Sequence, residues 1–349
     1  MQSILLTGTA GFIGSNFVPY FLEKYPNYNL VNLDLLTYAG NLENLKECEG
    51  NPRYKFIKGD ICNRELVEFI FNEYDVRGVI HFAAESHVDN SIKNPGVFVQ
   101  TNVNGTFTLI DVAYKYWMEK PFTFKESYKG CRFHHISTDE VYGTLSLDPN
   151  DLFTETTPYA PNSPYSASKA SSDMIIRAYH ETYGMNTVIT NCSNNYGPKQ
   201  HDEKLIPTII RNALKGNPIP IYGDGKNIRD WLYVLDHCKG IDLVYHEGKN
   251  GDTYNIGGRN ERTNLQIVDR ICTILDEKVP SHNVIARETK QSIASYKDLI
   301  TFVEDRAGHD RRYAIDATKL ENELGWKADE NFDTGIVKTI EWYLKKYNI

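Results

Sequence analysis

A run of glycines near the amino terminus constrains the fold more than any other feature of this 349-residue chain. Gly8, Gly11 and Gly14 separate a buried strand predicted over residues 3–7 from an apolar-periodic helix predicted to reach about Tyr25. At this spacing the first glycine permits a tight turn, the second lets backbone approach a pyrophosphate, and the third lets the helix pack on the strand. The helix start also offers free N–H groups and a positive dipole end to phosphates. We therefore expect a dinucleotide to bind here, with a purely structural turn as the alternative.

The next predicted strand, residues 29–33, indicates which dinucleotide is bound. It ends in Asp34, and an acid about 20 residues past the glycines is placed to accept a hydrogen bond from a ribose 2′-hydroxyl. Its charge would repel a 2′-phosphate, so NAD is favoured over NADP. Phe12 and Ile13, inside the glycine run, complete the predicted cofactor contacts of the turn.

Strand and helix signals alternate along the rest of the first half. Further strands are predicted at residues 54–57, 79–83, 132–136 and 187–191, with helical stretches between them. Alternation of this kind indicates an α/β protein with a Rossmann-type, doubly wound parallel sheet. Residues 253–256 read as a strand that rejoins this sheet.

The length of the chain exceeds what one hydrophobic core comfortably holds, so two domains are predicted. Residues 1–190 are expected to form the NAD-binding domain, with a later returning segment near residues 228–258. Residues 191–349 are expected to form mainly a smaller, mixed substrate domain.

Composition narrows the possible partners. The net charge of -8 argues against nucleic acid or an anionic membrane. The start of the chain has no basic region, so no signal peptide is predicted, and no apolar stretch approaches the ~20 residues that span a bilayer. The six cysteines are scattered without a CxxC pair, which predicts no metal site and free thiols in a cytoplasmic protein.

A hydroxyl and two carboxylates follow the strand predicted at residues 132–136. They belong to Thr138, Asp139 and Glu140. In an open parallel sheet, ligands bind outside the carboxyl ends of the strands, so these side chains should face a ligand as an acid/base set. A solvated turn is the alternative, because Ser, Thr and Asp are common turn residues.

Tyr165 and Lys169 lie four residues apart on a helix predicted to reach about Thr182, so they share one helix face. Tyrosine has a reference pKa of ~10, and a neighbouring ammonium together with a cationic nicotinamide can lower it. The same lysine can bind the nicotinamide ribose. Catalysis is favoured over an exposed helix face, because the pair follows a glycine fingerprint and a Thr-bearing strand end.

Polar and small residues after two more strands are further candidates. Asp60, followed by Ile61, could reach the adenine edge or could simply cap a helix. Ala83 and Ala84 would let the backbone pass close to the cofactor. Further along the same run, Ser86 is a candidate substrate contact and His87 either contacts substrate or fills a polar pocket. His134 and His135 are expected to be packed imidazoles, because no matching ligand spacing is near.

Taken together, the glycine run, the Thr-bearing strand end and the YxxxK pair resemble the extended short-chain dehydrogenase/reductase family over essentially the whole chain. The run from Ser137 to Gly143 resembles, more narrowly, the dTDP-glucose 4,6-dehydratases of that family. Sugar epimerases of the family usually lack the Asp–Glu pair. The resemblance implies a tightly bound, internally recycled NAD, a nucleotide-sugar substrate and a homodimer formed through the helices near Asn102 and Tyr165.

The resemblance also implies contacts in the second half of the chain. It assigns Asn194 to the substrate and Asn195 to the cofactor, and it matches Arg229 to an arginine that binds diphosphate, with a surface salt bridge as the alternative. Residues 199–202 depart from a more aromatic, proline-containing family version, which affects local sugar contacts. The remaining implied substrate contacts are Lys204, Leu205, Pro220, Tyr222, Asn264, Asp305, Arg306 and His309.

The implied reaction converts dTDP-glucose to dTDP-4-keto-6-deoxyglucose. Tyr165, assisted by Thr138, takes the proton of the 4-hydroxyl while hydride leaves carbon 4. Glu140 removes the proton on carbon 5, and Asp139 protonates the departing 6-hydroxyl before hydride returns to carbon 6. The alternatives are a 4,6-dehydratase or 4-epimerase acting on another nucleotide sugar, or a non-catalytic NAD-binding sensor.

Overall fold

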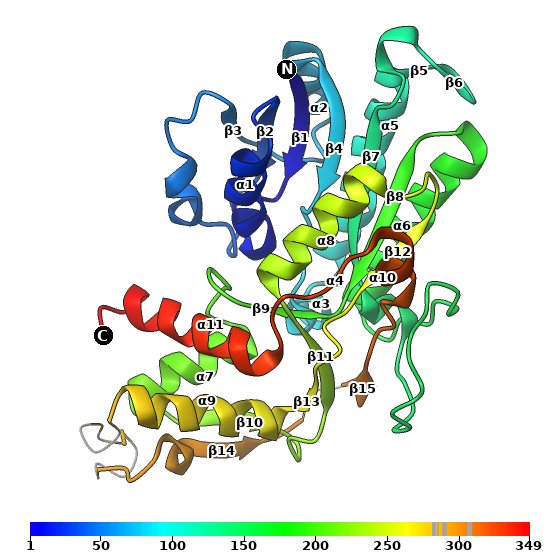
Figure 1. Cartoon of the computed structure of the whole chain (residues 1–349). Helices are drawn as coiled ribbons and strands as arrows, with labels where there is room; N and C mark the ends of the chain where they lie inside the picture. The colour runs from blue at the N-terminus through cyan, green and yellow to red at the C-terminus, as the bar shows by residue number, and fades with distance from the viewer. Residues whose placement is uncertain (281–283, 285, 288–291, 306–308) are drawn as a thin grey trace.

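A seven-stranded parallel sheet forms the centre of the larger part of the molecule (Figure 1). The computed structural model describes residues 1–280, 284, 286–287, 292–305 and 309–349. The strands lie in the order β12-β8-β7-β4-β1-β2-β3, so the chain reverses direction across the sheet between β1 and β4. Ligands bind at such a switch point in doubly wound sheets. The strands are β1 (Gln2–Thr7), β2 (Tyr28–Asp34), β3 (Tyr54–Lys58), β4 (Val76–His81), β7 (Arg132–Thr138), β8 (Thr187–Cys192) and β12 (Thr253–Ile256).

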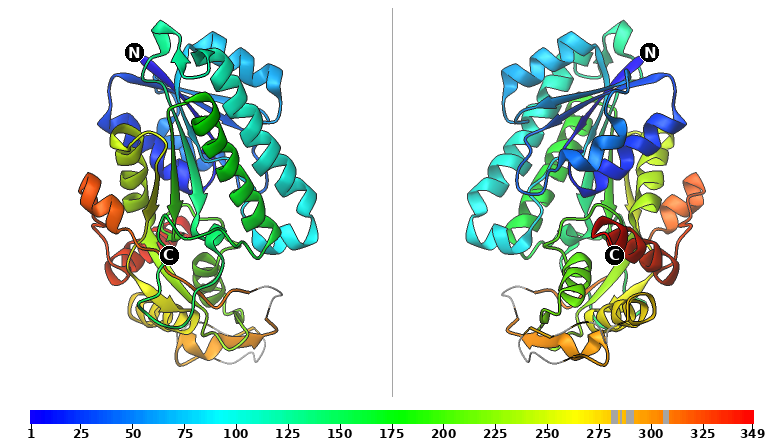
Figure 2. Two further views of the ribbon diagram at one scale, coloured as in Figure 1. Left: turned by 90° about the vertical axis from the view of Figure 1, so that its right-hand side faces the viewer. Right: turned by 90° about the vertical axis from the view of Figure 1, so that its left-hand side faces the viewer.

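Helices cover both faces of this sheet (Figure 2). Side chains alternate along β1: Ile4 and Leu6 belong to the buried cluster that includes α1 and α8, whereas Leu5 belongs to the cluster on the other face. Burial on both faces explains why these strands read as nearly continuous apolar runs. The covering helices are α1 (Phe12–Lys24) and α8 (Val234–Glu247) on one face, and α2 (Arg64–Tyr74), α5 (Thr106–Trp117) and α6 (Pro164–Tyr183) on the other.

The smaller part lies beyond the carboxyl ends of these strands, at the bottom of Figure 1. Its core packs three helices on two small sheets, one of which is mixed, because β11 pairs antiparallel with β13 and parallel with β15. The fold class predicted from the sequence is confirmed. The elements are α7 (Leu205–Leu214), α9 (Asn264–Lys278), α11 (Phe332–Lys346), β9 (Asn194–Tyr196), β10 (Ile219–Tyr222), β11 (Ile228–Tyr233), β13 (Glu261–Thr263), β14 (Ile300–Val303) and β15 (Arg312–Tyr313).

The segment near residues 228–258 contributes to both parts. β12 pairs with β8 in the large sheet, as expected, whereas β11 belongs to the smaller part. The division at residue 190 stays a prediction.

Shorter elements are α3 (Val88–Lys93), α4 (Pro95–Phe98), η2 (Val99–Gly105), α10 (Thr318–Leu324), the β5–β6 hairpin (Met118–Lys120, Thr123–Phe124), η1 (Leu42–Cys48), η3 (Glu126–Tyr128), η4 (Asp139–Tyr142) and η6 (Tyr296–Leu299). In the part of the chain that the structure describes, every helix is too short or too polar to cross a membrane.

Candidate active site

The glycine turn is built so that side chains would not fit at two of its three glycines. Gly8 has a φ of +72°, and a Cβ there would lie 2.5 Å from Ala83 Cα. A Cβ on Gly14 would lie 2.5 Å from Thr9 Cα, where α1 packs on the turn. Gly11 lines a cavity, and a Cβ there would meet Gly8 O at 3.2 Å. This close-packed turn at the start of α1 fits a dinucleotide pyrophosphate.

Asp34 ends β2 and faces the same cavity. Its Oδ2 accepts a hydrogen bond from Ala10 N at 2.8 Å, and its Oδ1 accepts one from Leu36 N at 2.8 Å. Burial raises the pKa of Asp34, although both backbone bonds oppose that shift. Asp60, the neighbouring acid, accepts from Cys62 N at 2.8 Å, whereas Asn63 caps α2. The interpretation of Asp60 as a helix cap is therefore wrong, and Asp60 instead lies in the cavity wall.

One cavity at the carboxyl ends of the large sheet gathers most of the predicted site. It is lined by Gly8, Gly11, Phe12, Ile13, Gly14, Asp34, Asp60, Ile61, Ala83, Ala84, Ser86, Thr138, Asp139, Glu140, Tyr165, Lys169, Asn194, Asn195 and Lys204. Among the acceptor atoms of its wall, Asp139 Oδ2 and Asn194 Oδ1 are buried without a hydrogen-bond partner in the part of the chain that the structure describes. Unpaired buried acceptors of this kind indicate a polar ligand.

Thr138 places the two carboxylates. It is the last residue of β7 and caps the short helix η4, where its Oγ1 accepts from Glu140 N at 3.3 Å and donates to Asp139 Oδ1 at 3.4 Å. The backbone turns at this cap, so that both acids line one cavity instead of pointing to opposite faces of a strand. Burial, followed by the charge of Glu140, raises the pKa of Asp139 well above its ordinary value, which favours the protonated form that a general acid requires.

Tyr165 lies in the first turn of α6, which Ser163 and Ser166 cap reciprocally. The neighbouring Thr138 hydroxyl favours the ionised form of its phenol, which by itself would lower the pKa of Tyr165. The structure differs here from the expectation that Lys169 lowers the tyrosine pKa. Burial and the charge of Glu140 instead raise the pKa of Tyr165 well above 10, so the protein groups alone do not favour the phenolate.

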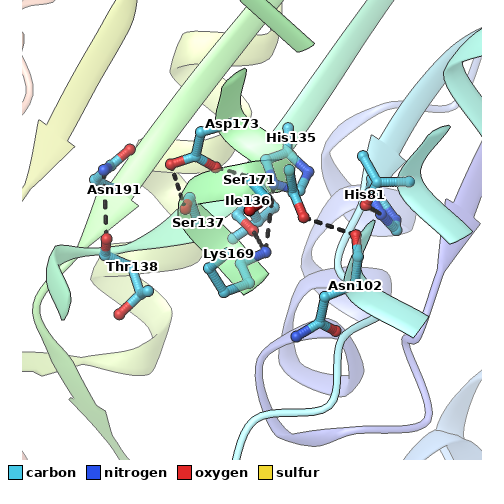
Figure 3. Close-up of polar contacts among 12 residues, drawn as sticks. His81, Asn102, His135, Ile136, Ser137, Thr138, Lys169, Ser171, Asp173 and Asn191 are labelled. Atoms are coloured by element: carbon cyan, nitrogen blue, oxygen red, sulfur yellow. Dashed lines mark hydrogen bonds and ion pairs between the residues drawn. The ribbon is translucent and has the colours of Figure 1, made fainter. Parts of the chain in front are cut away.

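Lys169 is held one turn further along α6 (Figure 3). Its Nζ donates to Ile136 O at 2.8 Å and lies 3.3 Å from His135 Nε2. Burial lowers the pKa of Lys169 to about 8. His134 is bound to Thr190 at 3.0 Å, so the expectation of packed imidazoles in this strand is confirmed.

Several predicted substrate contacts lie outside this cavity. Arg229 is buried, donates to Asp310 O at 2.9 Å and stacks 4.2 Å from the Tyr313 ring, while Asp224 pairs with Arg311. Asp305 lies beside the turn that follows β10, and its Oδ1 accepts a hydrogen bond from His309 Nδ1 at 2.6 Å. Arg306 lies outside the described residues. The others outside the cavity are His87, Leu205, Pro220, Tyr222 and Asn264, of which Asn264 follows Thr263, the residue that caps α9.

Sequence reasoning missed several acidic and polar residues of the cavity wall. Glu85 and Glu203 both line it, and Glu203 lies 3.8 Å from His87 Nε2. Burial and the charge of Glu203 raise the pKa of Glu85. Their place in the sequence could have identified them, because Glu85 directly follows the predicted contact Ala84 and Glu203 directly precedes the predicted contact Lys204.

Comparisons with known proteins agree with this geometry. The family model described as GDP-mannose 4,6 dehydratase matches residues 5–339. A dTDP-glucose 4,6-dehydratase of Neisseria meningitidis is 54% identical over 99% of this chain and 94% of the relative. The crystal structure of a dTDP-glucose 4,6-dehydratase from Bacillus anthracis in complex with NAD superimposes with a TM-score of 0.84 at 46% identity, covering 100% of this chain and 98% of that one.

A second solved dTDP-glucose 4,6-dehydratase, from Streptomyces venezuelae with NAD bound, gives a TM-score of 0.85 at 42% identity, covering 99% of this chain and 98% of that one. Identity above half over nearly the full length, joined to a site with the glycine turn, the two carboxylates and the Tyr–Lys pair in one cavity, places this chain in the GDP-mannose 4,6 dehydratase family as a member of its dTDP-glucose 4,6-dehydratases.

Proposed function

We propose that this chain is an NAD-dependent lyase that dehydrates dTDP-glucose to dTDP-4-keto-6-deoxyglucose. The observation that carries the proposal is the placement of Asp139 and Glu140 in the same cavity as Tyr165, Lys169 and the glycine turn. Oxidation alone needs only the tyrosine and lysine, whereas elimination of water also needs an acid and a base.

The glycine turn, Asp34 and the backbone near Ala83 would hold the cofactor, with Lys169 at its nicotinamide end. When bound, NAD supplies the reversible hydride acceptor that oxidation at carbon 4 and reduction at carbon 6 require. Its positive charge also favours the Tyr165 phenolate, together with the Lys169 ammonium, against the burial that raises the pKa of Tyr165.

The protein side chains then move protons at three substrate atoms. Tyr165 takes the proton of the 4-hydroxyl, and Thr138 hydrogen-bonds the same oxygen. Glu140 removes the proton from carbon 5, which the new ketone acidifies, and returns a proton there at the end. Asp139, whose protonated form is favoured by burial, protonates the departing 6-hydroxyl so that water leaves.

This scheme leaves a proton imbalance inside the protein after each turnover. Tyr165 gains the 4-hydroxyl proton and Asp139 loses one to water, so one proton has to pass between them or through solvent. Thr138 donates to Asp139 Oδ1 at 3.4 Å and its hydroxyl also influences the pKa of Tyr165, so we place it on the direct route.

The family expectation of a homodimer is also proposed for this chain. It is supported by large apolar side chains exposed on neighbouring helices of one face: Ile92, Val97, Val99, Phe107 and Met174. Exposed apolar patches mark association sites. Light scattering of the purified protein tests the dimer.

A cytoplasmic location is proposed because all six cysteines are free, several of them buried in the core.

The test of function is an assay of purified protein with dTDP-, UDP-, CDP- and GDP-glucose, with products identified by mass and NMR. The expected result is loss of water from dTDP-glucose with a 4-keto-6-deoxy product. Inversion at carbon 4 without loss of water would identify an epimerase, and no turnover of any sugar would contradict catalysis altogether.

A further inference from the structure

Three titratable side chains lie in line along one face of α6. Tyr165, Lys169 and Asp173 are spaced four residues apart, and their exposed fractions are 8%, 3% and 2%. The proposed reaction uses the first two. Asp173 does not line the cavity, so it lies behind the reacting groups rather than among them.

Asp173 is held firmly from the side of the sheet. Its Oδ2 accepts from Ser137 Oγ at 2.8 Å (Figure 3). The same oxygen accepts from Tyr159 OH at 3.0 Å. Its Oδ1 lies 3.2 Å from His135 Nε2, a contact that is not aligned as a hydrogen bond. Burial raises the pKa of Asp173 to about 6, while the charge of Lys169 and the two hydroxyl donors oppose the rise. The carboxylate is therefore mostly ionised at neutral pH.

The groups packed around Lys169 leave Asp173 as its counter-charge. From β7, His135 has a pKa lowered well below its ordinary value by burial and by Lys169, so it is neutral. From β4, the ring centroid of His81 lies 5.2 Å from that of His135, and burial also lowers the pKa of His81. From β8, burial raises the pKa of the Cys192 thiol, which keeps it neutral. Burial drives the lysine toward the neutral amine, and the carboxylate opposes it.

We propose that Asp173 is a positioning residue, which acts through Lys169: its carboxylate, fixed by Ser137 and Tyr159, keeps the lysine an ammonium and turned toward Ile136 O beside the cofactor cavity. Neutral His135 fills the space between the two without adding a competing charge. The proposal rests on the proposed function, because the ammonium matters there for forming the Tyr165 phenolate.

The test is Asp173→Asn, which removes the charge and keeps the shape. The oxidation half-reaction, followed as nicotinamide reduction after rapid mixing, requires a charged lysine. In a plot of this rate against pH, the fall at high pH (the basic limb) should therefore move to lower pH by about one to three units. A shift of this size is the usual effect of losing a nearby opposite charge. KM should change little, because Asp173 does not line the substrate cavity. An unchanged limb would overturn the proposal.

A second readout needs no turnover. The ultraviolet absorbance of tyrosinate, titrated with NAD present and referenced to the same protein carrying Tyr165→Phe, reports ionisation of Tyr165. In Asp173→Asn the phenolate should form at higher pH than in the wild type, and equal titrations would contradict the role. This readout survives if the substrate proves to be another sugar, so failure of the proposed function and failure of this inference are distinguishable.

Two variants separate charge from structure. Thr190→Val removes the buried bond to His134 from the strand beside β7, without touching Lys169, and should leave the basic limb where it is. Asp173→Glu keeps the charge and should restore the limb, which a merely structural role would not require. If Asp173→Asn does not fold, Asp173→Ser carries the same expectation with a smaller neutral side chain.

Discussion

Replacing Asp139 with asparagine separates the oxidation from the elimination. Asparagine has the shape of a protonated aspartate but cannot donate an acidic proton to the departing 6-hydroxyl. Losing a general acid typically costs about 10² to 10⁴ in rate. At about 1.36 kcal/mol per tenfold, this is roughly 3 to 5 kcal/mol on the elimination barrier. Oxidation at carbon 4 uses Tyr165 and Lys169, so it should proceed.

The structure also predicts that this variant stays folded. Asp139 is 2% exposed, and burial raises its pKa well above the unfolded value. A carboxyl whose pKa rises on folding costs stability as the pH climbs above the unfolded pKa, because the folded state resists ionising it. A neutral asparagine removes that cost. The variant should therefore unfold at or above the wild-type temperature at neutral pH, measured by calorimetry.

The assay is rapid mixing of Asp139→Asn with substrate, followed by absorbance of reduced nicotinamide and by product analysis. Reduced nicotinamide and the 4-keto sugar should accumulate on the protein, while 6-deoxy product forms slowly. Tyr165→Phe is the matched control, since it should stop earlier and form little reduced nicotinamide. Elimination by Asp139→Asn at the wild-type rate would refute Asp139 as the acid.

Two cofactor predictions follow from the glycine turn and β2. Asp34→Ala should weaken NAD binding and narrow the gap to NADP in titration calorimetry, and unchanged affinity for both would remove Asp34 from the site. Gly8→Ala should cost NAD affinity and about 1 to 3 kcal/mol of stability, because its Cβ would lie 2.5 Å from Ala83 Cα at a φ of +72°. Gly130→Ala is the control, because Gly130 has a φ of +87° and open space around it. This variant should lose stability while its affinity for NAD stays unchanged.

Local patterns predicted the large sheet well, because its strands are buried on both faces. The glycine run, Asp34 and the alternating strands located the cofactor cavity, and Thr253–Ile256 joined the sheet as expected. Boundaries were less accurate. β4 spans Val76–His81 rather than residues 79–83, because α2 ends at Asp75 in a left-handed conformation and the strand begins at once.

Electrostatics could not be predicted in the same way. Spacing alone shows that Tyr165 and Lys169 share a helix face, but the pKa of each depends on burial by chain segments far away in sequence. Spacing also missed Asp173, although it continues the same line, because nothing local shows that His135 and Ser137 surround it. Side-chain caps were equally hidden: Thr263 caps α9 although Asn264 is an equally good capping residue.

The central claim, that hydride leaves carbon 4 and returns to carbon 6 of the same sugar, is tested most directly with dTDP-glucose deuterated at carbon 4. The product should carry deuterium at carbon 6 and a solvent hydrogen at carbon 5, as read by NMR and mass spectrometry in ordinary and heavy water. Deuterium lost to water or to free reduced nicotinamide would contradict the account.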